Sequence, residues 1–515
     1  MLMVPVTISY EDFKALISGR IKRYFTAVEY VTKHAGDKKF LTRPLLGELL
    51  SQASQIEELL DSYGARNNCR WAKFRSLTAA IKLFSNVSYE LLHIQHSIPA
   101  YRLLPVKQDF AKYTEETLYI CEEILIEAAK RLLEVAGQLH LPTENLSIPE
   151  TSYSETLPPG RLPHDLAMRK IEAVSQTVSM LATAFLNLAA ESRNALPGRL
   201  TKPQAYLCEL TGPVSEEKLR SLELRFHNLQ SLYDTYVSTT ETEVFDNDLP
   251  VLRGHISVVL HLLRTARDLA HYYERHASPV AHPIVKVSKR LVEPEKLLDV
   301  LINYCINFVS LYLNCAELLC QDMLKRYTEI GHIEVPVPQY RGFHVRPSTL
   351  VSKLVLHYGS DVKMKLGDDS YDASSPLELF RANEKINAHK RRSLAQEIIC
   401  LDLVPSVPGD KSLKTIVRDI IMTLAERGKI ILYEQPLKIE DKPYSPDTKL
   451  LEQVIDEIAK LQMMGKIDIG TDIRAVFIGD KRVLQDIQLL AENGYGEDIV
   501  GNNIPLPERL AYLRQ

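Results

Sequence analysis

The sequence lacks the cysteine patterns of metal-binding and disulfide-rich proteins. Its seven cysteines are odd in number and scattered through apolar segments, and none forms a Cys-x-x-Cys pair. We therefore expect neither a zinc site nor a disulfide framework, and reduced, buried thiols in a cytoplasmic protein are the simplest interpretation. The formal net charge is only −4. It gives no reason to expect nucleic acid or an acidic membrane as the main partner.

Signals for secretion and membrane insertion are also weak. The first residues, MLMVPVTISYEDFK, contain no basic region followed by an apolar stretch, so no signal peptide is expected. Residues 297–320 are apolar enough to raise the question of a membrane span. Their polar residues form one stripe of a helix: Asp299, Asn303, Asn307, Ser310, Asn314 and Glu317. This narrow stripe favours a mostly buried helix of a soluble bundle over a lipid-facing helix.

The chain of 515 residues is long enough for several domains, and its composition is that of a soluble globular protein. Apolar residues in the first part follow helical spacing, which predicts two helical domains, 1–140 and 164–330. A Pro- and Ser-rich linker, 141–163, separates them. The pattern then changes to mixed strands and helices, which predicts an α+β domain at 331–435 and a small α/β extension at 436–515.

The α+β domain is expected to be an open-faced sandwich with the order β-α-β-β-α-β-α and one added strand. Its expected elements include strands at 332–338, 397–403 and 429–434, and helices at 375–395 and 410–428. The extension is expected to contain a helix at 448–463, a strand at 474–479 and a helix at 481–492.

The segment GFHVRPS, residues 342–348, places an imidazole at the mouth of one of these helices. Pro347 suits the first helical turn, where its missing N–H costs nothing. The unbonded N–H groups of that turn carry partial positive charge and bind phosphate readily. His344 can therefore take a phosphoryl group on a ring nitrogen, and Arg346 can clamp the phosphoryl oxygens.

Three neighbouring residues are expected to support this anion-binding nest. Gly342 lets the chain turn tightly so that the imidazole lies over the helix mouth. Arg341 adds a second cation, and the N–H near Ser348 points back toward His344. This arrangement requires neither a metal ion nor a second catalytic base.

Gly342-Phe343-His344-Val345-Arg346-Pro347-Ser348 resembles the signature of the histidine-containing phosphocarrier family (HPr) of the sugar phosphotransferase system. That signature is Gly-Leu-His-x-Arg-Pro followed by a small residue. The resemblance covers about residues 332–428. It implies that His344 accepts a phosphoryl group on Nδ1 from a phosphohistidine donor such as enzyme I, with help from Arg346, and passes it to an acceptor protein. It implies no cofactor, and without a nucleotide-binding loop the chain would be a carrier or sensor, not a kinase.

Ser375 has two interpretations. The family's regulatory serine opens the second helix 31 residues after the histidine, and Ser375 stands at that interval. Ser375-Pro376-Leu377-Glu378 is also a capping box, which accounts for the serine structurally. Residues 376–396 lengthen this helix beyond the family's pattern. The cluster His389-Lys390-Arg391-Arg392 within it is more typical of a solvated helix face than of the alternative, a docking patch.

Other classes of function remain open. The HPr-like domain could be a non-catalytic scaffold that serves only assembly. Glu90-x-x-His93 and Asp268-x-x-His271 each place a carboxylate and an imidazole one turn apart, as di-iron bundles do, but paired groups on long helices have the same spacing. His164, followed by Asp and Leu, resembles the phosphoacceptor helix of sensor kinases, yet no ATP-binding glycine boxes follow it.

Overall fold

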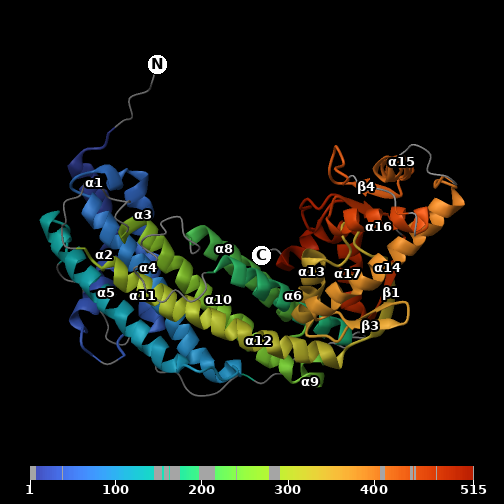
Figure 1. Cartoon of the computed structure of the whole chain (residues 1–515). Helices are drawn as coiled ribbons and strands as arrows, with labels where there is room; N and C mark the ends of the chain where they lie inside the picture. The colour runs from blue at the N-terminus through green and yellow to red at the C-terminus, as the bar shows by residue number, and fades with distance from the viewer. Residues whose placement is uncertain are drawn as a thin grey trace. The chain divides into compact units, whose positions relative to one another are not determined.

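The computed structural model describes residues 7–37, 39–143, 153–155, 162, 174–196, 215–238, 240–277, 290–405, 412–440, 445, 448–470 and 472–513. The chain divides into two compact units, Met1–Cys320 and Gln321–Gln515 (Figure 1). The described part of the first unit is almost entirely helical. The second unit combines helices with small antiparallel sheets, so the predicted large helical region followed by a smaller part of mixed strands and helices is confirmed.

One core holds the helices of the first unit together. They are α1 (Tyr10–Ser18), α2 (Lys22–Lys33), α3 (Arg43–Ser62), α4 (Ala72–Tyr101), α5 (Phe110–Gln138), α6 (Val174–Ala195), α8 (Glu216–Tyr236), α9 (Thr242–Phe245), α10 (Asp248–Tyr272), α11 (Pro294–Asp299) and the first part of α12 (Asn307–Arg326). Helix α10 packs against both α4 and α8, and Ile256, Val259 and Leu263 on it are fully buried. The two helical domains predicted on either side of 141–163 therefore form one unit.

Described residues of the predicted linker also pack against this unit. Tyr153 is buried, and its ring lies 4.9 Å from that of Tyr30. The Thr42 hydroxyl donates a hydrogen bond of 2.7 Å to the carbonyl of Tyr153, and the N–H of Arg43 donates to Glu155. These residues tie the segment to the start of α3. His164 lies outside the described residues.

The apolar segment that raised the question of a membrane span is a buried helix. A continuous helix runs from Pro294 to Arg326, and 67% of its most apolar stretch is buried inside the protein. Its polar stripe bonds within the protein, since Asn307 donates to Gln108 and Glu317 accepts from Arg193. Such burial is typical of a core helix in a soluble protein.

The second unit is built on a four-stranded antiparallel sheet in the order β1-β6-β2-β3. Its elements are β1 (Ile330–Pro336), α13 (Val345–Tyr358), β2 (Lys363–Leu366), β3 (Asp369–Asp372), α14 (Pro376–Cys400), α15 (Leu413–Glu426), β4 (Ile430–Leu432), α16 (Leu450–Met463), β5 (Ile467–Ile469), β6 (Arg474–Asp480), α17 (Lys481–Glu492) and the 3-10 turns η5 (Gly494–Gly496) and η6 (Glu508–Leu513). Helices α13, α14 and α17 pack together with this sheet.

The strand predicted at 429–434 does not belong to this sheet. It is β4, which pairs with β5 in a separate two-stranded sheet. The place between β1 and β2 is taken by β6, with Phe477 opposite both Ile333 and Met364. The boundary predicted at residue 435 is therefore wrong, because a strand assigned to the extension lies inside the main sheet.

The prediction of a strand at 397–403 is also wrong, because α14 continues as a helix to Cys400. Leu394 and Ile398, one turn apart, are buried in a second apolar core made with α15, β4, α16 and β5. A short apolar run has no periodicity that separates strand from helix, so this tertiary contact decides its conformation. Elements α15 to β5 thus form an inserted layer that packs against the end of α14.

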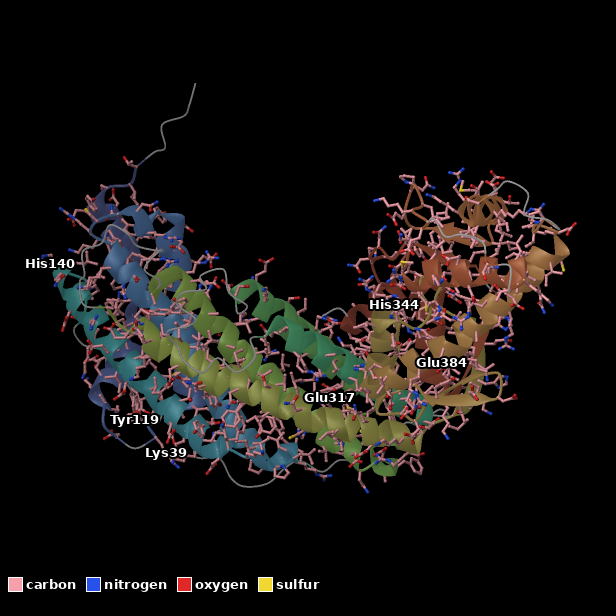
Figure 2. The ribbon with its side chains drawn as sticks, viewed as in Figure 1. Lys39, Tyr119, His140, Glu317, His344 and Glu384 are labelled. Carbon is pink, nitrogen blue, oxygen red and sulfur yellow. The ribbon has the colours of Figure 1, made fainter. Side chains whose placement is uncertain are left out.

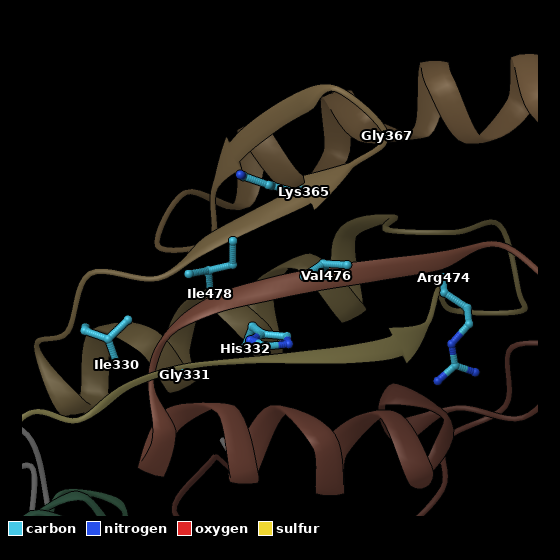
Figure 3. A pocket seen from close by; sticks show the side chains of 8 residues that line it. All are labelled: Ile330, Gly331, His332, Lys365, Gly367, Arg474, Val476 and Ile478. Carbon is cyan, nitrogen blue, oxygen red and sulfur yellow. The ribbon is translucent and has the colours of Figure 1, made fainter.

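A pocket lies on one face of the main sheet, called the open face here, and no helix residue of the described part of the chain lines it. Figure 3 shows this pocket, which is lined only by strand and turn residues: Ile330, Gly331, His332, Lys365, Gly367, Arg474, Val476 and Ile478. Along β6, Ala475 and Phe477 are fully buried while Val476 and Ile478 are partly exposed, as the alternation of a strand requires.

Candidate functional site

His344 is the N-cap residue of α13. Figure 2 labels its side chain in the second unit. A tight turn precedes it, in which Arg341 and Gly342 both have left-handed backbone angles, with φ of 54° and 64°. The N–H of His344 donates to the carbonyl of Gly342 at 2.8 Å. A Cβ at Gly342 would lie 2.4 Å from Oδ1 of Asn383, so glycine fits this turn both sterically and conformationally. The turn places His344 at the mouth of the helix, as predicted.

The first turn of α13 offers fewer unbonded amides than expected. Pro347 lies in this turn, as predicted, and has no N–H. The N–H of Ser348 donates to the carbonyl of His344 at 3.1 Å, and its buried hydroxyl donates to the carbonyl of Phe343 at 2.7 Å. Ser348 therefore stabilises the turn and does not face a ligand. The N–H groups of Val345 and Arg346 make no recorded hydrogen bond within the described residues.

The contacts of Arg341 are with Tyr340 and the inserted layer. Its N–H donates to Oδ2 of Asp468 at 3.1 Å, and its Nη2 donates to the carbonyl of Gly465 at 3.3 Å. The guanidinium also lies 5.2 Å from the centre of the Tyr340 ring. These contacts connect the turn before His344 to the inserted layer, which is a structural role that the sequence did not predict.

A buried carboxylate joins the two predicted catalytic residues. The Nε2 atom of His344 lies 2.8 and 2.9 Å from the two carboxylate oxygens of Glu497. Nη1 of Arg346 lies 3.6 Å from the same carboxylate and 3.4 Å from the carbonyl of Gly501. The side chain of Glu497 is only 2% exposed, whereas those of His344 and Arg346 are 22% and 37% exposed. The structure thus brings His344 and Arg346 together through Glu497.

Aromatic rings form a wall beside the imidazole. The ring of Tyr340 meets that of His344 edge to face at 5.4 Å, and the ring of Tyr433 lies 5.2 Å from that of Tyr340. Burial and the nearby Asp468 carboxylate raise the pKa of Tyr433. Within the described residues, Nδ1 of His344 makes no recorded hydrogen bond. One ring nitrogen is therefore held by protein and the other is not.

Sequence reasoning missed Glu497, which comes from the segment after α17. Its only local signal is a carboxylate that directly follows the glycine-containing turn Gly494-Tyr495-Gly496. This segment is anchored because the Tyr495 hydroxyl donates to the carbonyl of Pro336 at 2.8 Å. A separation of 153 residues lies between His344 and Glu497, so no spacing pattern could join them.

Ser375 is the N-cap of α14, as its capping box predicted. Its hydroxyl oxygen accepts the N–H of Glu378 at 3.4 Å, and Pro376 is the first helical residue. The carboxylate of Glu378 accepts the N–H of Asp372 at 2.9 Å instead of that of Ser375. The structure records no contact between Ser375 and His344 within the described residues.

Three of the four residues in the two di-iron-like motifs are engaged in ion pairs, and the fourth, His93, lies 3.1 Å from the Tyr101 hydroxyl. The pairs are Glu90–His261, Arg267–Asp268 and His271–Glu216. Burial raises the pKa of Glu90, but the hydrogen bond from His261 and the charge of Arg264 outweigh it and lower that pKa overall. Among the residues that the structure describes, no group of three or more His, Cys, Asp or Glu side chains could hold a metal ion.

Comparison with known proteins found no matching family model, curated protein or solved structure. The chemistry at the start of α13 therefore provides the indication of function. That site contains an imidazole with one nitrogen held by a carboxylate, a guanidinium, and two amides without a hydrogen-bond partner among the described residues. Such a set can bind and stabilise a small anion next to a nucleophilic ring nitrogen.

Proposed function

We propose that the second unit is a phosphoryl acceptor of the HPr type. His344 takes the group on Nδ1 from a phosphohistidine of an enzyme I-like donor protein and passes it to an acceptor, or signals by it, in the cytoplasm. The observation that carries the proposal is the hydrogen bond between Nε2 of His344 and Glu497, because among the described residues it leaves Nδ1 as the unbonded ring nitrogen at the mouth of α13.

The order of elements supports this proposal. With α15 to β5 set aside as an insertion, the unit follows β1-α13-β2-β3-α14-β6-α17. This is the β-α-β-β-α-β-α order of the family that residues 342–348 resemble. The fourth strand and third helix are then β6 and α17, not the segments at 397–403 and 410–428 that were expected from the sequence.

The electrostatics also favour a bound phosphoryl group. The start of a helix carries about half a positive charge, which stabilises an anion by roughly 0.3–1 kcal/mol at an exposed site. Arg346, on the first turn, adds a permanently charged fork that can hold two phosphoryl oxygens. Both features act on a group attached to the ring of His344.

A second candidate is a scaffold in which the same fold no longer transfers phosphoryl groups. The low exposure of the His344 side chain, 22%, favours it, because a donor protein must reach a largely covered ring. The inserted layer favours it too, since residues of that layer bind the turn before His344.

Labelling of the full chain separates the two candidates. The protein is incubated with phosphoenolpyruvate and enzyme I from its own source, and intact mass is measured. The proposal expects one phosphoryl group that is labile in acid and stable in base, absent from His344→Ala. His332→Ala is the matched control, because His332 lies on the open face of the sheet, and it should keep the label. An unlabelled wild type supports the scaffold, and a label that survives in His344→Ala overturns His344 as the accepting residue.

A further inference from the structure

The segment that carries Glu497 is closed by its own hydrogen bonds. The carboxylate of Asp498 accepts the N–H groups of Val500 and Asn502 at 2.9 and 2.8 Å. The N–H of Ile504 donates to the carbonyl of Gly496 at 3.0 Å, and Glu497 pairs with Asn503 in an isolated antiparallel bridge. Glu497 is therefore held in place from both sides before any phosphoryl group arrives.

The contacts of Glu497 determine which nitrogen of His344 carries the ring proton. A buried carboxylate needs donors, and the recorded partners of its side chain are His344 and Arg346. An ionised carboxylate only accepts hydrogen bonds, so Nε2 of His344 must donate. In a neutral ring the proton is then on Nε2, and Nδ1 keeps its lone pair.

We propose that Glu497 is a positioning residue for phosphoryl transfer: it fixes the ring proton of His344 on Nε2 and so makes Nδ1 the accepting nitrogen. This inference rests on the proposed function and adds to it a residue that acts through His344. A purely structural role, in which Glu497 only ties its segment to α13, makes different predictions for a conservative variant.

Phosphoryl transfer needs only His344, Glu497 and the phosphohistidine of the donor protein. The lone pair of Nδ1 forms an N–P bond while the P–N bond of the donor's phosphohistidine breaks, and that electron pair goes to the donor's ring nitrogen. The proton stays on Nε2, and the carboxylate of Glu497 offsets the positive charge of the ring. When the group moves on, the N–P bond breaks, its electron pair returns to Nδ1, and a neutral imidazole remains.

Glu497→Gln tests the inference with little change of shape. The Gln amide can accept from Nε2 or donate to it, so it permits both tautomers, whereas the carboxylate permits one. Glu492→Gln is the matched control, because it makes the same chemical change on the exposed end of α17. Thermal unfolding of both variants shows whether the fold is retained, and Glu497→Asp provides a second variant that keeps the charge if the Gln variant does not fold.

The first measurement is nitrogen NMR of the full chain labelled with ¹⁵N-histidine, with the His344 signals identified by their loss in His344→Ala. In mildly basic buffer, wild type should show His344 with the proton on Nε2, and Glu497→Gln should show a mixture of tautomers. A wild-type ring with its proton on Nδ1, or an unchanged tautomer in the variant, overturns the inference. This readout does not depend on phosphorylation.

The second measurement is the initial rate of labelling from enzyme I and phosphoenolpyruvate. Glu497→Gln should be labelled on the same histidine at least about tenfold more slowly, as expected when a ring loses the group that holds its tautomer. Glu492→Gln should match wild type. An unchanged rate in Glu497→Gln overturns only this inference, whereas a wild type that takes no label overturns the proposed function.

Discussion

Lys390 and Asp468 form a buried ion pair between α14 and the inserted layer. The ammonium nitrogen of Lys390 lies 2.9 Å from each carboxylate oxygen of Asp468, and both side chains are almost fully buried. The same carboxylate accepts the N–H of Arg341, two residues from Phe343 and three from His344. The pair thus connects the insertion to the turn that positions the candidate site. The sequence pattern predicts that the basic cluster containing Lys390 faces solvent. The structure instead buries the Lys390 side chain.

Replacing Lys390 by Met should destabilise the second unit strongly. Asp468 would remain buried without its counter-ion, and breaking a buried pair in this way costs about 3–5 kcal/mol. Hydrogen exchange of peptides from α14 and β5 measures the loss as a fall in protection.

Two further variants check that the unpaired buried charge causes the loss of protection. Lys390→Met combined with Asp468→Asn should recover much of the protection, because no unpaired charge is left. Lys385→Met, on the same helix, removes an exposed pair with Asp369 and should change protection little. Equal losses in Lys385→Met and Lys390→Met would contradict the role of burial.

Arg346→Gln should slow the labelling of His344 by about ten- to a hundredfold, because the permanently charged fork next to the ring is lost. Arg346→Lys should restore the rate only in part, since an ammonium cannot hold two oxygens at once. The measurement is the initial rate from enzyme I and phosphoenolpyruvate. Arg474→Gln, on the open sheet face, is the control and should behave as wild type. A labelling rate equal to wild type in Arg346→Gln would show that Arg346 takes no part in phosphoryl transfer.

Asp486→Ala should loosen the C-terminal segment from α17. The Asp486 carboxylate accepts the hydroxyls of Tyr358 and Tyr512 at 2.8 and 2.9 Å and lies 2.8 Å from Nε of Arg509. Burial, followed by the charge of Asp486, raises the pKa of Tyr358, so its hydroxyl stays protonated and needs an acceptor. Losing that acceptor should cost about 2–4 kcal/mol.

Limited proteolysis with trypsin at Arg509, within η6, measures this loosening as faster cleavage. Gln488→Ala, on the exposed side of the same helix, should leave the rate of cleavage unchanged. If Asp486→Ala is cleaved no faster than wild type, the carboxylate does not anchor the segment.

The first unit should lose stability as the pH falls below about 6.5, in part through His255. Burial lowers the pKa of His255 below its ordinary value of 6.5, and its hydrogen bond with the carbonyl of Val251 opposes this only in part. Between the folded and unfolded pKa values, the unfolded chain binds the proton and the folded chain does not. Stability therefore falls on acidification through this window, by at most about 1.4 kcal/mol for each pH unit.

Fluorescence of Trp71 measures this effect, because Trp71 is the single tryptophan and is buried in the first unit. Urea midpoints are compared at about pH 7.5 and about pH 5.5. His255→Gln, which cannot titrate, should show a smaller decrease than wild type. His34→Gln, on an exposed helix end, is the control and should show the full decrease. An equal decrease in His255→Gln would assign the pH dependence to other groups.

Local features of the candidate site could be predicted because neighbouring residues determine them. The turn at Gly342, the N-cap at His344 and the N-cap at Ser375 each depend on contacts within a few positions of the chain. The helix predicted at 481–492 also has the observed bounds, since its apolar spacing and its Asp480 cap are local.

Contacts between distant residues decided the rest. Leu394 and Ile398 continue α14 where a strand was expected, because a core made by later elements buries them. Asp468 buries Lys390 from 78 positions away, and Glu497 reaches His344 from 153 positions away. The sequence by itself determined where a histidine meets a helix start. Only the tertiary structure decided which nitrogen of that ring is bound, because the carboxylate that binds it is brought there by the pairing of β6 between β1 and β2.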